Sequence, residues 1–236
     1  MSDMEAQDFW LHHLGSASRF NEWVFARIRR RLGNRILEIG CGTGNFTALM
    51  AADGRSVTAI DRHAPFVEFA RRRLGDNPYV RVICGDALEH QWSESFDTVV
   101  LLDVLEHIDD HVSFLRSLQN CLTQDGRLVV KVPAGQWLYG PMDKAIGHYR
   151  RYSPRSLAAA LTAAGFVPEV RSYFNVLGIL GWWLNGKVLK RVTPPAEQVG
   201  LFDRLVPILR FIETVLPLPM GLSLIAIGTR PVDPVA

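Results

Sequence analysis

Residues 36–46 read ILEIGCGTGNF, an apolar run with one acid, Glu38, that leads directly into Gly40, Gly42 and Gly44. A strand that runs into a glycine-rich turn and then a helix is typical of loops whose backbone N–H groups approach a ligand. The dinucleotide fingerprint is G-x-G-x-x-G, whereas these glycines are spaced G-x-G-x-G, and no Lys-Ser or Lys-Thr pair follows to make a P-loop. Both phosphate-binding interpretations are therefore disfavoured.

Short β-rich runs alternate with helical patterns from Arg35 onward, as in a parallel sheet with crossover helices. Strands are predicted at 36–39, 57–60, 80–84, 98–102 and 127–132. Helical spacing occurs between them at 46–53, 65–75 and 111–126, and the last two of these end at Gly or Asp-Gly stop signals. Beyond a polar stretch that ends at Ser153, the pattern predicts a helix from Pro154 through Ala164, a strand near 169–174, a helix around 202–215 and an apolar run at 222–230.

Two further acids follow predicted strands. Asp61 closes the second strand about 20 residues past the glycine loop, where a carboxylate can bind both hydroxyls of a ribose. Asp86 follows the third strand, where a side chain can reach the exocyclic amine of an adenine. A ligand with adenine and ribose but no pyrophosphate needs both acids and tolerates Glu38 beneath the loop; S-adenosylmethionine has this anatomy.

Five segments occur in an order and spacing that resemble the class I S-adenosylmethionine-dependent methyltransferases. They are ILEIGCGTGNF, VTAID, GDALE, FDTVVLLDVLEHIDD and LTQDGRLVVKVP, within roughly residues 20 to 135. The later stretches LYGPMDKAIGHYRRYSPRSLAAALTAAGF and PMGLSLIAIGTRP resemble, less specifically, a bacterial subgroup that modifies sugar-, lipid- or natural-product-type acceptors. That similarity does not name an acceptor.

The resemblance implies a role for each matching residue, with S-adenosylmethionine as cofactor and S-adenosylhomocysteine as product. Glu38 lies under the loop, Asp61 binds the ribose with Arg62 beside the adenine, and Asp86 and Ala87 meet the adenine edge. The methionine part of the cofactor is wrapped by Gly40, Cys41, Gly42, Gly44 and Asn45, and the floor near the sulfonium is lined by Leu102, Asp103 and His107.

Some of these residues have simpler interpretations. Asp61 could only cap the helix that begins near Ala64, and Cys41 is a small loop filler in this family rather than a nucleophile. His107 is as well explained by packing or capping as by catalysis. His107 and His111 are four residues apart and, with Asp103, Asp109 and Asp110, imitate a metal cluster; a charged helix start explains them more simply, so no metal is expected.

Acceptor chemistry is expected from residues 139–152, which connect the fifth strand to the next helix and so lie at the carboxyl end of the sheet. Because the sulfonium is already a strong electrophile, the enzyme chiefly has to place a nucleophile in line with the methyl group. Asp143, His148 and Tyr149 are candidate proton acceptors or orienters, and His148 is preferred because its ordinary pKa lies closest to working pH. Acceptor contacts are predicted at Tyr139, Tyr149, Arg150, Arg151, Tyr152 and Trp183. The alternative is a structural latch, with Arg150 or Arg151 paired to a carboxylate and Ser153 capping the next helix.

The segment NVLGILGWWLNGKVLKR, residues 175–191, places Leu177, Leu180, Trp183 and Leu184 broadly on one face if it is helical, ahead of a basic end. It could be a lid over an apolar acceptor, an interfacial membrane anchor, a dimer contact or a packed cover of the sheet. Near the other end, Trp10, Phe20 and Trp23 lie on predicted helices that close over the cofactor in related enzymes or pack in the core.

Composition narrows the function classes. The net charge of +2 and a pI near 8.5 are too mild to imply nucleic acid. The longest uncharged stretch, 173–186, falls short of the roughly 20 residues that span a bilayer, and the acidic N-terminus lacks the pattern of a secretory signal. Three cysteines without CxxC spacing favour a reducing cytoplasm.

The sequence predicts one α/β, Rossmann-like domain with a seven-stranded sheet, mostly parallel with an antiparallel last strand and helices on both faces. The expected parts are an N-terminal helical cover (1–33), a core sheet (34–174 and 219–230) and a helical insertion that shapes the acceptor pocket (175–218). The predicted function is methyl transfer from S-adenosylmethionine to a small-molecule, lipid- or sugar-like acceptor, most favourably at oxygen. An NAD(P)-dependent oxidoreductase and a non-catalytic adenosyl-ligand-binding protein stay open as alternatives, as does a homodimer.

Overall fold

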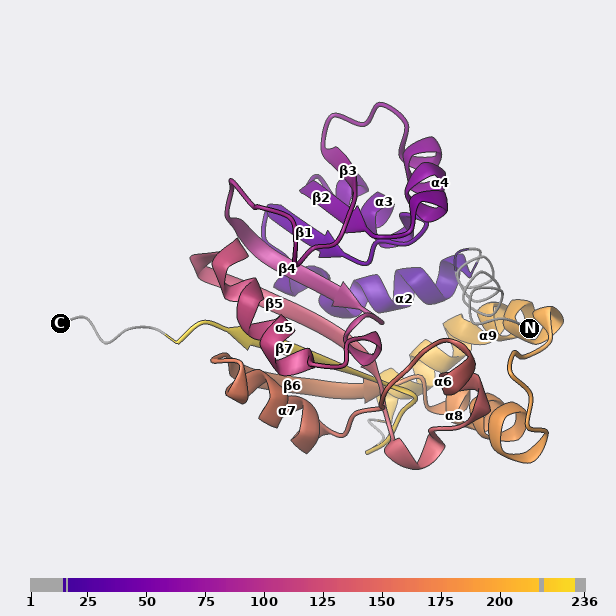
Figure 1. Ribbon diagram of the computed structural model, residues 1–236. Helices are drawn as coiled ribbons and strands as arrows, with labels where there is room; N and C mark the ends of the chain where they lie inside the picture. The colour runs from indigo at the N-terminus through magenta and orange to yellow at the C-terminus, as the bar shows by residue number, and fades with distance from the viewer. Residues whose placement is uncertain (1–14, 16, 217–218, 232–236) are drawn as a thin grey trace.

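The computed structural model describes residues 15, 17–216 and 219–231 and contains one seven-stranded sheet with helices on both faces (Figure 1). The strands are β1 (Arg35–Ile39), β2 (Ser56–Asp61), β3 (Val80–Cys84), β4 (Phe96–Leu102), β5 (Leu122–Pro133), β6 (Val167–Phe174) and β7 (Ser223–Thr229). The α-helices are α2 (Ser18–Ile28), α3 (Asn45–Ala52), α4 (Ala64–Leu74), α5 (His111–Ser117), α6 (Pro141–Ala145), α7 (Pro154–Ala163), α8 (Val176–Trp182) and α9 (Ala196–Val215). The predicted fold class is confirmed.

The strand order β3-β2-β1-β4-β5-β7-β6 places the end of β1 beside the end of β4. β1 to β5 are parallel, and β7 runs antiparallel to both β5 and β6. The chain winds outward from β1 to β3 and returns to β4 on the other side, so the strand order reverses between β1 and β4. In open α/β sheets, ligands bind outside the carboxyl ends of the strands at this reversal.

Two apolar clusters hold the sheet between its helices. One face packs Leu115 and Leu157 from α5 and α7 against β4 and β5, and the other packs Trp23 of α2 and Leu209 of α9 against β1 and β7. Phe20 and Trp23 are 7% and 1% exposed and make edge contacts with each other, so both belong to the core. Trp10 lies outside the described residues.

Local signals start and stop several helices where the sequence predicts. Ser153 caps α7 by accepting a hydrogen bond from the backbone N–H of Ser156 at 3.1 Å, and Pro154 occupies the first turn. Gly75 and Gly165 follow α4 and α7 with positive φ, which glycine adopts without strain.

The predicted helical pattern over 111–126 is only partly correct. α5 ends at Ser117, residues 118–121 form a short 3-10 turn, and β5 already begins at Leu122. Leu122 pairs with Phe96 across a bulge, so the strand pairing overrides the local helical spacing. The helix predicted around 202–215 starts earlier, at Ala196.

Between β6 and β7, residues 175–216 are largely helical, in the region where the sequence predicts a helical insertion. α8 continues into a π-helix at Trp183–Val188, and α9 follows after a short connection. Glu213 of α9 accepts hydrogen bonds from the N–H groups of Asn175 and Val176 at 3.2 and 2.8 Å, so the C-terminal part of α9 holds the start of α8. We call residues 176–216 the helical cap.

Candidate active site

The glycine loop after β1 is held by the end of β2 and the loop after β4. Gly40, Gly42 and Gly44 have φ values of 73°, 52° and 77°. A side chain at Gly40 would also bring a Cβ to 2.5 Å from Cγ2 of Val104, so that position needs glycine both for its conformation and for space. The loop after β1 therefore packs directly on the loop after β4.

Asp61 ties this loop to the carboxyl end of β2. Its Oδ2 accepts a hydrogen bond from the N–H of Gly42 at 2.9 Å, and its Oδ1 accepts one from the N–H of His63 at 2.9 Å. The N-cap residue of α4 is His63, and no side chain among the described residues caps that end, so the bond from His63 to Asp61 precedes the helix and is not the cap that the sequence left open. The bond from Gly42 gives Asp61 a loop-fixing role. Since each carboxylate oxygen has two lone pairs, both oxygens retain acceptor capacity for ligand hydroxyls.

Glu38 lies below the loop at 3% exposure and accepts a hydrogen bond from the Thr47 hydroxyl. Burial, with a smaller contribution from Asp61, raises the pKa of Glu38 to about 8. Burial likewise raises the pKa of the Cys41 thiol, which argues against a nucleophilic role for Cys41. With this raised pKa, Glu38 is mainly protonated at neutral pH, so the floor of the loop is polar and uncharged.

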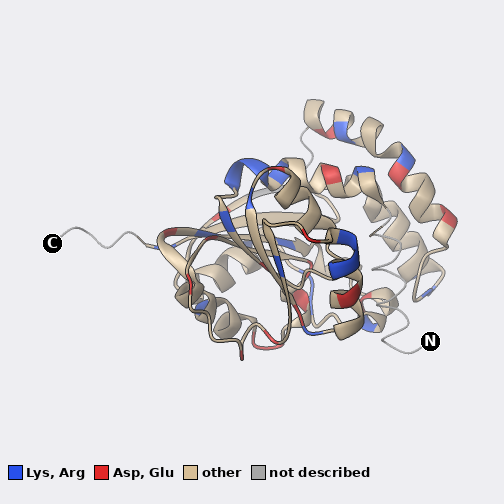
Figure 2. Cartoon of the chain, turned by 90° about the horizontal axis from the view of Figure 1, so that it is seen from above, with Lys and Arg blue, Asp and Glu red and all other residues tan. Residues whose placement is uncertain are grey.

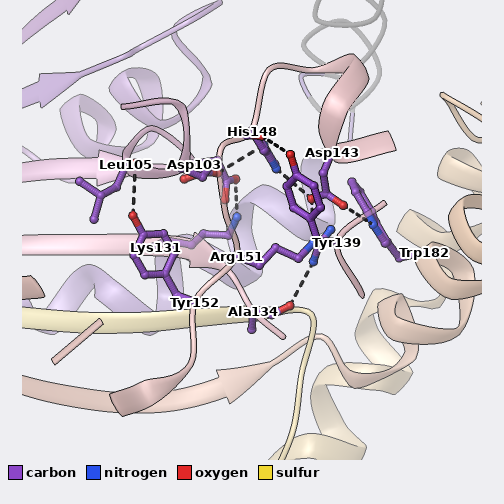
Figure 3. Close-up of polar contacts among 11 residues, drawn as sticks. Asp103, Leu105, Lys131, Ala134, Tyr139, Asp143, His148, Arg151, Tyr152 and Trp182 are labelled. Carbon is purple, nitrogen blue, oxygen red and sulfur yellow. Dashed lines mark hydrogen bonds and ion pairs between the residues drawn. The ribbon is translucent and has the colours of Figure 1, made fainter. Parts of the chain in front are cut away.

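The other predicted cofactor contacts follow β2 to β4 at the same edge. Asp86 is exposed, and its Oδ1 accepts a hydrogen bond from the N–H of Leu88 at 2.8 Å. Asp103 has a positive φ of 56° and pairs with Lys131, a side chain only 5% exposed (Figure 3). The Lys131 partner was missed in the sequence, although one lysine inside the apolar run of β5 is a usable signal.

His148 is the centre of a second polar cluster, which lies beside the Asp103–Lys131 pair (Figure 3). Its Nδ1 lies 3.0 Å from Oδ1 of Asp143, which also accepts a hydrogen bond from Nε of Arg151 at 2.7 Å. Oδ2 of Asp143 accepts hydrogen bonds from the N–H of Gly140 at 3.0 Å and from Nε1 of Trp182 at 3.3 Å. Burial opposes ionisation of Asp143, but the hydrogen bond from His148 and the charge of Arg151 outweigh it and lower the pKa of Asp143.

An ionised Asp143 fixes the tautomer of His148. Nδ1–H of His148 donates to the carboxylate, so Nε2 is the basic nitrogen. Nε2 lies 3.7 Å from Oε1 of Glu106, and the His107 ring meets the His148 ring edge-on with centroids 4.7 Å apart. Burial and then His148 lower the pKa of His107 to about 3, so His107 is neutral. The arrangement suits proton acceptance at Nε2 of His148.

Glu106 was not among the predicted site residues. Its side chain is fully buried, and among the described residues neither carboxylate oxygen has a hydrogen-bond partner. Burial and then Asp103 raise the pKa of Glu106 well above its ordinary value. Ligand atoms of Glu106, His107 and His148 lie within 4.8 Å of one another, a grouping able to hold a metal ion; the absence of a metal stays a prediction.

His107 and His111 do not lie together as a pair of metal ligands. His107 ends a 3-10 turn, whereas His111 begins α5 and lies 2.9 Å from Nη1 of Arg150. Asp110 caps α5 by accepting a hydrogen bond from the N–H of Ser113. Asp110 and His111 therefore belong to the start of α5, whereas His107 lies with Glu106 and His148 and Asp103 pairs with Lys131.

The predicted acceptor contacts differ in exposure, and Tyr139, Tyr149 and Arg150 are not fully buried. Tyr149 is exposed, while Arg150 is bound to the carbonyls of Ile108 and Asp109. Tyr139 donates a hydrogen bond to the His148 carbonyl at 2.7 Å.

The predicted acceptor contacts at Tyr152 and Arg151 are wrong. Tyr152 is 1% exposed and donates to the Leu105 carbonyl, and the Arg151 side chain is 1% exposed, so neither presents a surface to an acceptor. The Arg151–Asp143 pair and the Ser153 cap form the predicted structural latch, and the latch also holds His148. Trp182, rather than the predicted Trp183, reaches the site, with its ring 4.4 Å from Cζ of Arg151.

Comparison with known proteins agrees with this geometry. A family described as "Methyltransferase domain" matches residues 37–130. The ubiquinone biosynthesis O-methyltransferase of Xanthomonas axonopodis is 31% identical over 164 residues, which cover 63% of this chain and 68% of that protein. The mitochondrial enzyme of the same name from Schizosaccharomyces pombe is 35% identical over 126 residues, 51% of this chain and 46% of that protein. Several other curated relatives are also matched over about half of their length.

Solved structures share the fold at low identity. A SAM-dependent methyltransferase from Archaeoglobus fulgidus has a TM-score of 0.60 at 19% identity, covering 89% of this chain and 94% of that chain. The 1,6-didemethyltoxoflavin-N1-methyltransferase of Burkholderia thailandensis has a TM-score of 0.60 at 20% identity, covering 98% and 84%. The chain belongs to the class I S-adenosylmethionine-dependent methyltransferases. The loop after β1 and Asp61, whose two carboxylate oxygens retain acceptor capacity, fit the nucleoside of this cofactor.

Proposed function

We propose that the protein transfers a methyl group from S-adenosylmethionine to a hydroxyl oxygen of a small-molecule acceptor, with His148 as the general base. The observation that carries the proposal is the Asp143–His148 pair, which leaves Nε2 of His148 as the basic nitrogen beside the carboxyl edge of the sheet. Relatives named as ubiquinone biosynthesis O-methyltransferases support oxygen as the acceptor atom.

Each group has a defined part in this proposal. S-adenosylmethionine, when bound, supplies a methyl group on a sulfonium and leaves as S-adenosylhomocysteine. Asp61 holds the ribose, the glycine loop holds the methionine part of the cofactor, and Asp143 orients His148. Nε2 of His148 takes the hydroxyl proton of the acceptor as the new oxygen–carbon bond forms. A positioned base of this kind contributes about 100- to 10,000-fold to a rate.

The alternatives are separated by ligand binding. Calorimetric titration with S-adenosylmethionine, S-adenosylhomocysteine and NADH is expected to show binding of the two adenosyl ligands alone. Binding of NADH alone would contradict the proposal and favour an oxidoreductase. Adenosyl-ligand binding without turnover of any acceptor would favour a non-catalytic binding protein.

The base is tested by His148→Ala, with His111→Ala as the control because His111 is a neighbouring histidine outside the cluster. Methyl transfer from isotope-labelled S-adenosylmethionine to a panel of water-soluble phenols and catechols gives the turnover. His148→Ala is expected to lower turnover by about 100-fold or more while cofactor affinity stays the same. Equal turnover in the two variants would reduce His148 to a part of the latch.

The expected absence of a metal is tested in the same assay. Turnover is expected to survive treatment with a chelator. Loss of activity that Mg²⁺ restores would instead assign Glu106, His107 and His148 to a metal ion.

The acceptor pocket is proposed to lie between the 139–152 loop and the helical cap, because Trp182 and Lys187 of the cap both bind this loop. We expect a lipid-like acceptor with contact through residues 175–191. Three free thiols, at Cys41, Cys84 and Cys121, support a reducing cytoplasm as the site of action.

A further inference from the structure

Apolar exposure is concentrated on the helical cap. Of the 21 large apolar residues exposed in the described part of the chain, 15 lie within 177–220. Scattered apolar residues on a surface are normal, whereas a concentration of this size marks a surface that interacts with another protein, a membrane or a ligand.

α9 carries two apolar stripes on opposite sides. Val199, Val206 and Leu209 are buried on the side that faces the core. The exposed stripe recurs at spacings of four and three residues and consists of Leu201, Leu205, Ile208, Ile212 and Val215, which are between 39% and 59% exposed. Phe211, at 70% exposure, lies beside this stripe. The outer side of α9 is thus an apolar helix face that the described residues leave uncovered.

α8 and its π-helical continuation have a similar face. Leu177, Leu180, Leu184 and Val188 recur at helical spacing and are between 42% and 62% exposed. Trp183, at 45% exposure, is next to Trp182, which binds Asp143. The exposed apolar surface therefore begins one residue away from the candidate active site.

On the helical cap the basic side chains are exposed, whereas most of the acidic side chains are not. Its exposed cations are Lys190, Arg204 and Arg210, together with Lys187 and Arg191, which donate hydrogen bonds to the Tyr139 carbonyl and the Asn185 side chain. Two of its three acids are turned inward: Asp203 accepts a hydrogen bond from the N–H of Phe20, and Glu213 binds Arg27 and the start of α8. Only Glu197 is an exposed acid within 176–216. In Figure 2 the ribbon of these helices is largely tan, with isolated charged bands.

We propose that the exposed side of the helical cap binds the surface of an anionic lipid bilayer. Apolar helix faces enter the boundary between headgroups and acyl chains, and cations beside them attract anionic headgroups. A second copy of the chain fits less well, because it would place the same excess of cations against itself. Within the described residues, no helix has the length and apolar character that a membrane span requires.

The proposal does not depend on which acceptor is methylated. It does rest on the proposed function in one respect, since bilayer contact beside Trp182 would present a lipid-like acceptor to the 139–152 loop. Cofactor affinity is measured alongside bilayer binding, so failure of the one is distinguishable from failure of the other.

The test is co-sedimentation of the full chain with vesicles of phosphatidylcholine alone and of phosphatidylcholine with roughly 30 mol % phosphatidylglycerol. The chain is expected to bind the anionic vesicles more tightly, and roughly 0.5 M NaCl is expected to weaken that binding. The double variant Ile208→Glu/Phe211→Glu is expected to bind at least about tenfold more weakly, because it places charge in the apolar stripe.

The matched control is Tyr79→Glu/Val167→Glu, two exposed apolar residues at 56% and 55% exposure that lie outside the cap. Both double variants are expected to keep the affinity for S-adenosylhomocysteine, which shows that they are folded. Absence of binding to anionic vesicles, or an equal loss in the control, would overturn the proposal. A dimer in solution that only the cap variant dissociates would instead assign this face to a second copy of the chain.

Discussion

The loop after β1 and the loop after β5 both lie at the carboxyl edge of the sheet, but they are built differently. The first is fixed by its own glycines and by Asp61 at the next strand end, within about 20 residues of sequence. The second is fixed by side chains from distant segments, since Trp182 lies 39 residues from Asp143 in the sequence. The loop after β1 is therefore fixed by neighbours in the sequence, whereas the position of the loop after β5 depends on how the helical cap packs.

The largest expected effect concerns the acid beneath the local loop. Because the pKa of Glu38 is raised to about 8, the native protein keeps a proton that the unfolded chain releases near its ordinary pKa of 4.5. The unfolded state then binds fewer protons, so the free energy of unfolding falls as pH rises from about 4.5 to 8, by on the order of 5 kcal/mol. Denaturant titrations across this pH range should show a flatter profile for Glu38→Gln.

Glu68→Gln is the control for that experiment, because Glu68 is exposed on α4. It should keep the pH dependence of the parent chain. Identical slopes for Glu38→Gln and the parent chain would show that Glu38 does not hold the proton.

The next effect concerns the ribose site. Asp61→Ala should weaken binding of S-adenosylmethionine by about 2 kcal/mol, through the loss of charge-assisted hydrogen bonds to the ribose. Asp97→Ala is the matched control: Asp97 also accepts two backbone hydrogen bonds, from Asn34 and Arg35, but at the opposite edge of the sheet. Calorimetry should show unchanged affinity for this control, and equal losses in both variants would mean that Asp61 acts only on the fold.

The smallest effect concerns the contact between the cap and the second loop. Trp182→Phe removes the N–H that binds Asp143 and keeps an aromatic ring over Arg151. Turnover should fall about fivefold, corresponding to a hydrogen bond of about 1 kcal/mol, with unchanged cofactor affinity. Trp183→Phe, at the exposed neighbour, should leave turnover unchanged, and equal effects would remove the distinction between the two tryptophans.

Much of the predicted cofactor-binding region, from β1 to β4, could be predicted because the sequence patterns that mark it are local. Glycine spacing, acids at strand ends and the alternation of strands and helices all lie within short windows, and β3 was predicted to the residue at Val80–Cys84. The helical pattern over 111–126 failed where β5 recruits Leu122 into the sheet, because pairing with β4 outweighs local propensity.

By itself, the sequence determined the fold class, the strand–loop–helix frame and the positions of Gly40, Asp61 and Asp86, since each depends on neighbours in the chain. Only the tertiary structure decided that Asp143 holds His148 through Nδ1 and that Trp182 rather than Trp183 binds Asp143. It alone shows that Glu106 is buried with no hydrogen bond from the described residues. It also decided which side of α9 is left uncovered, because both of its sides are apolar and only packing against the core distinguishes them.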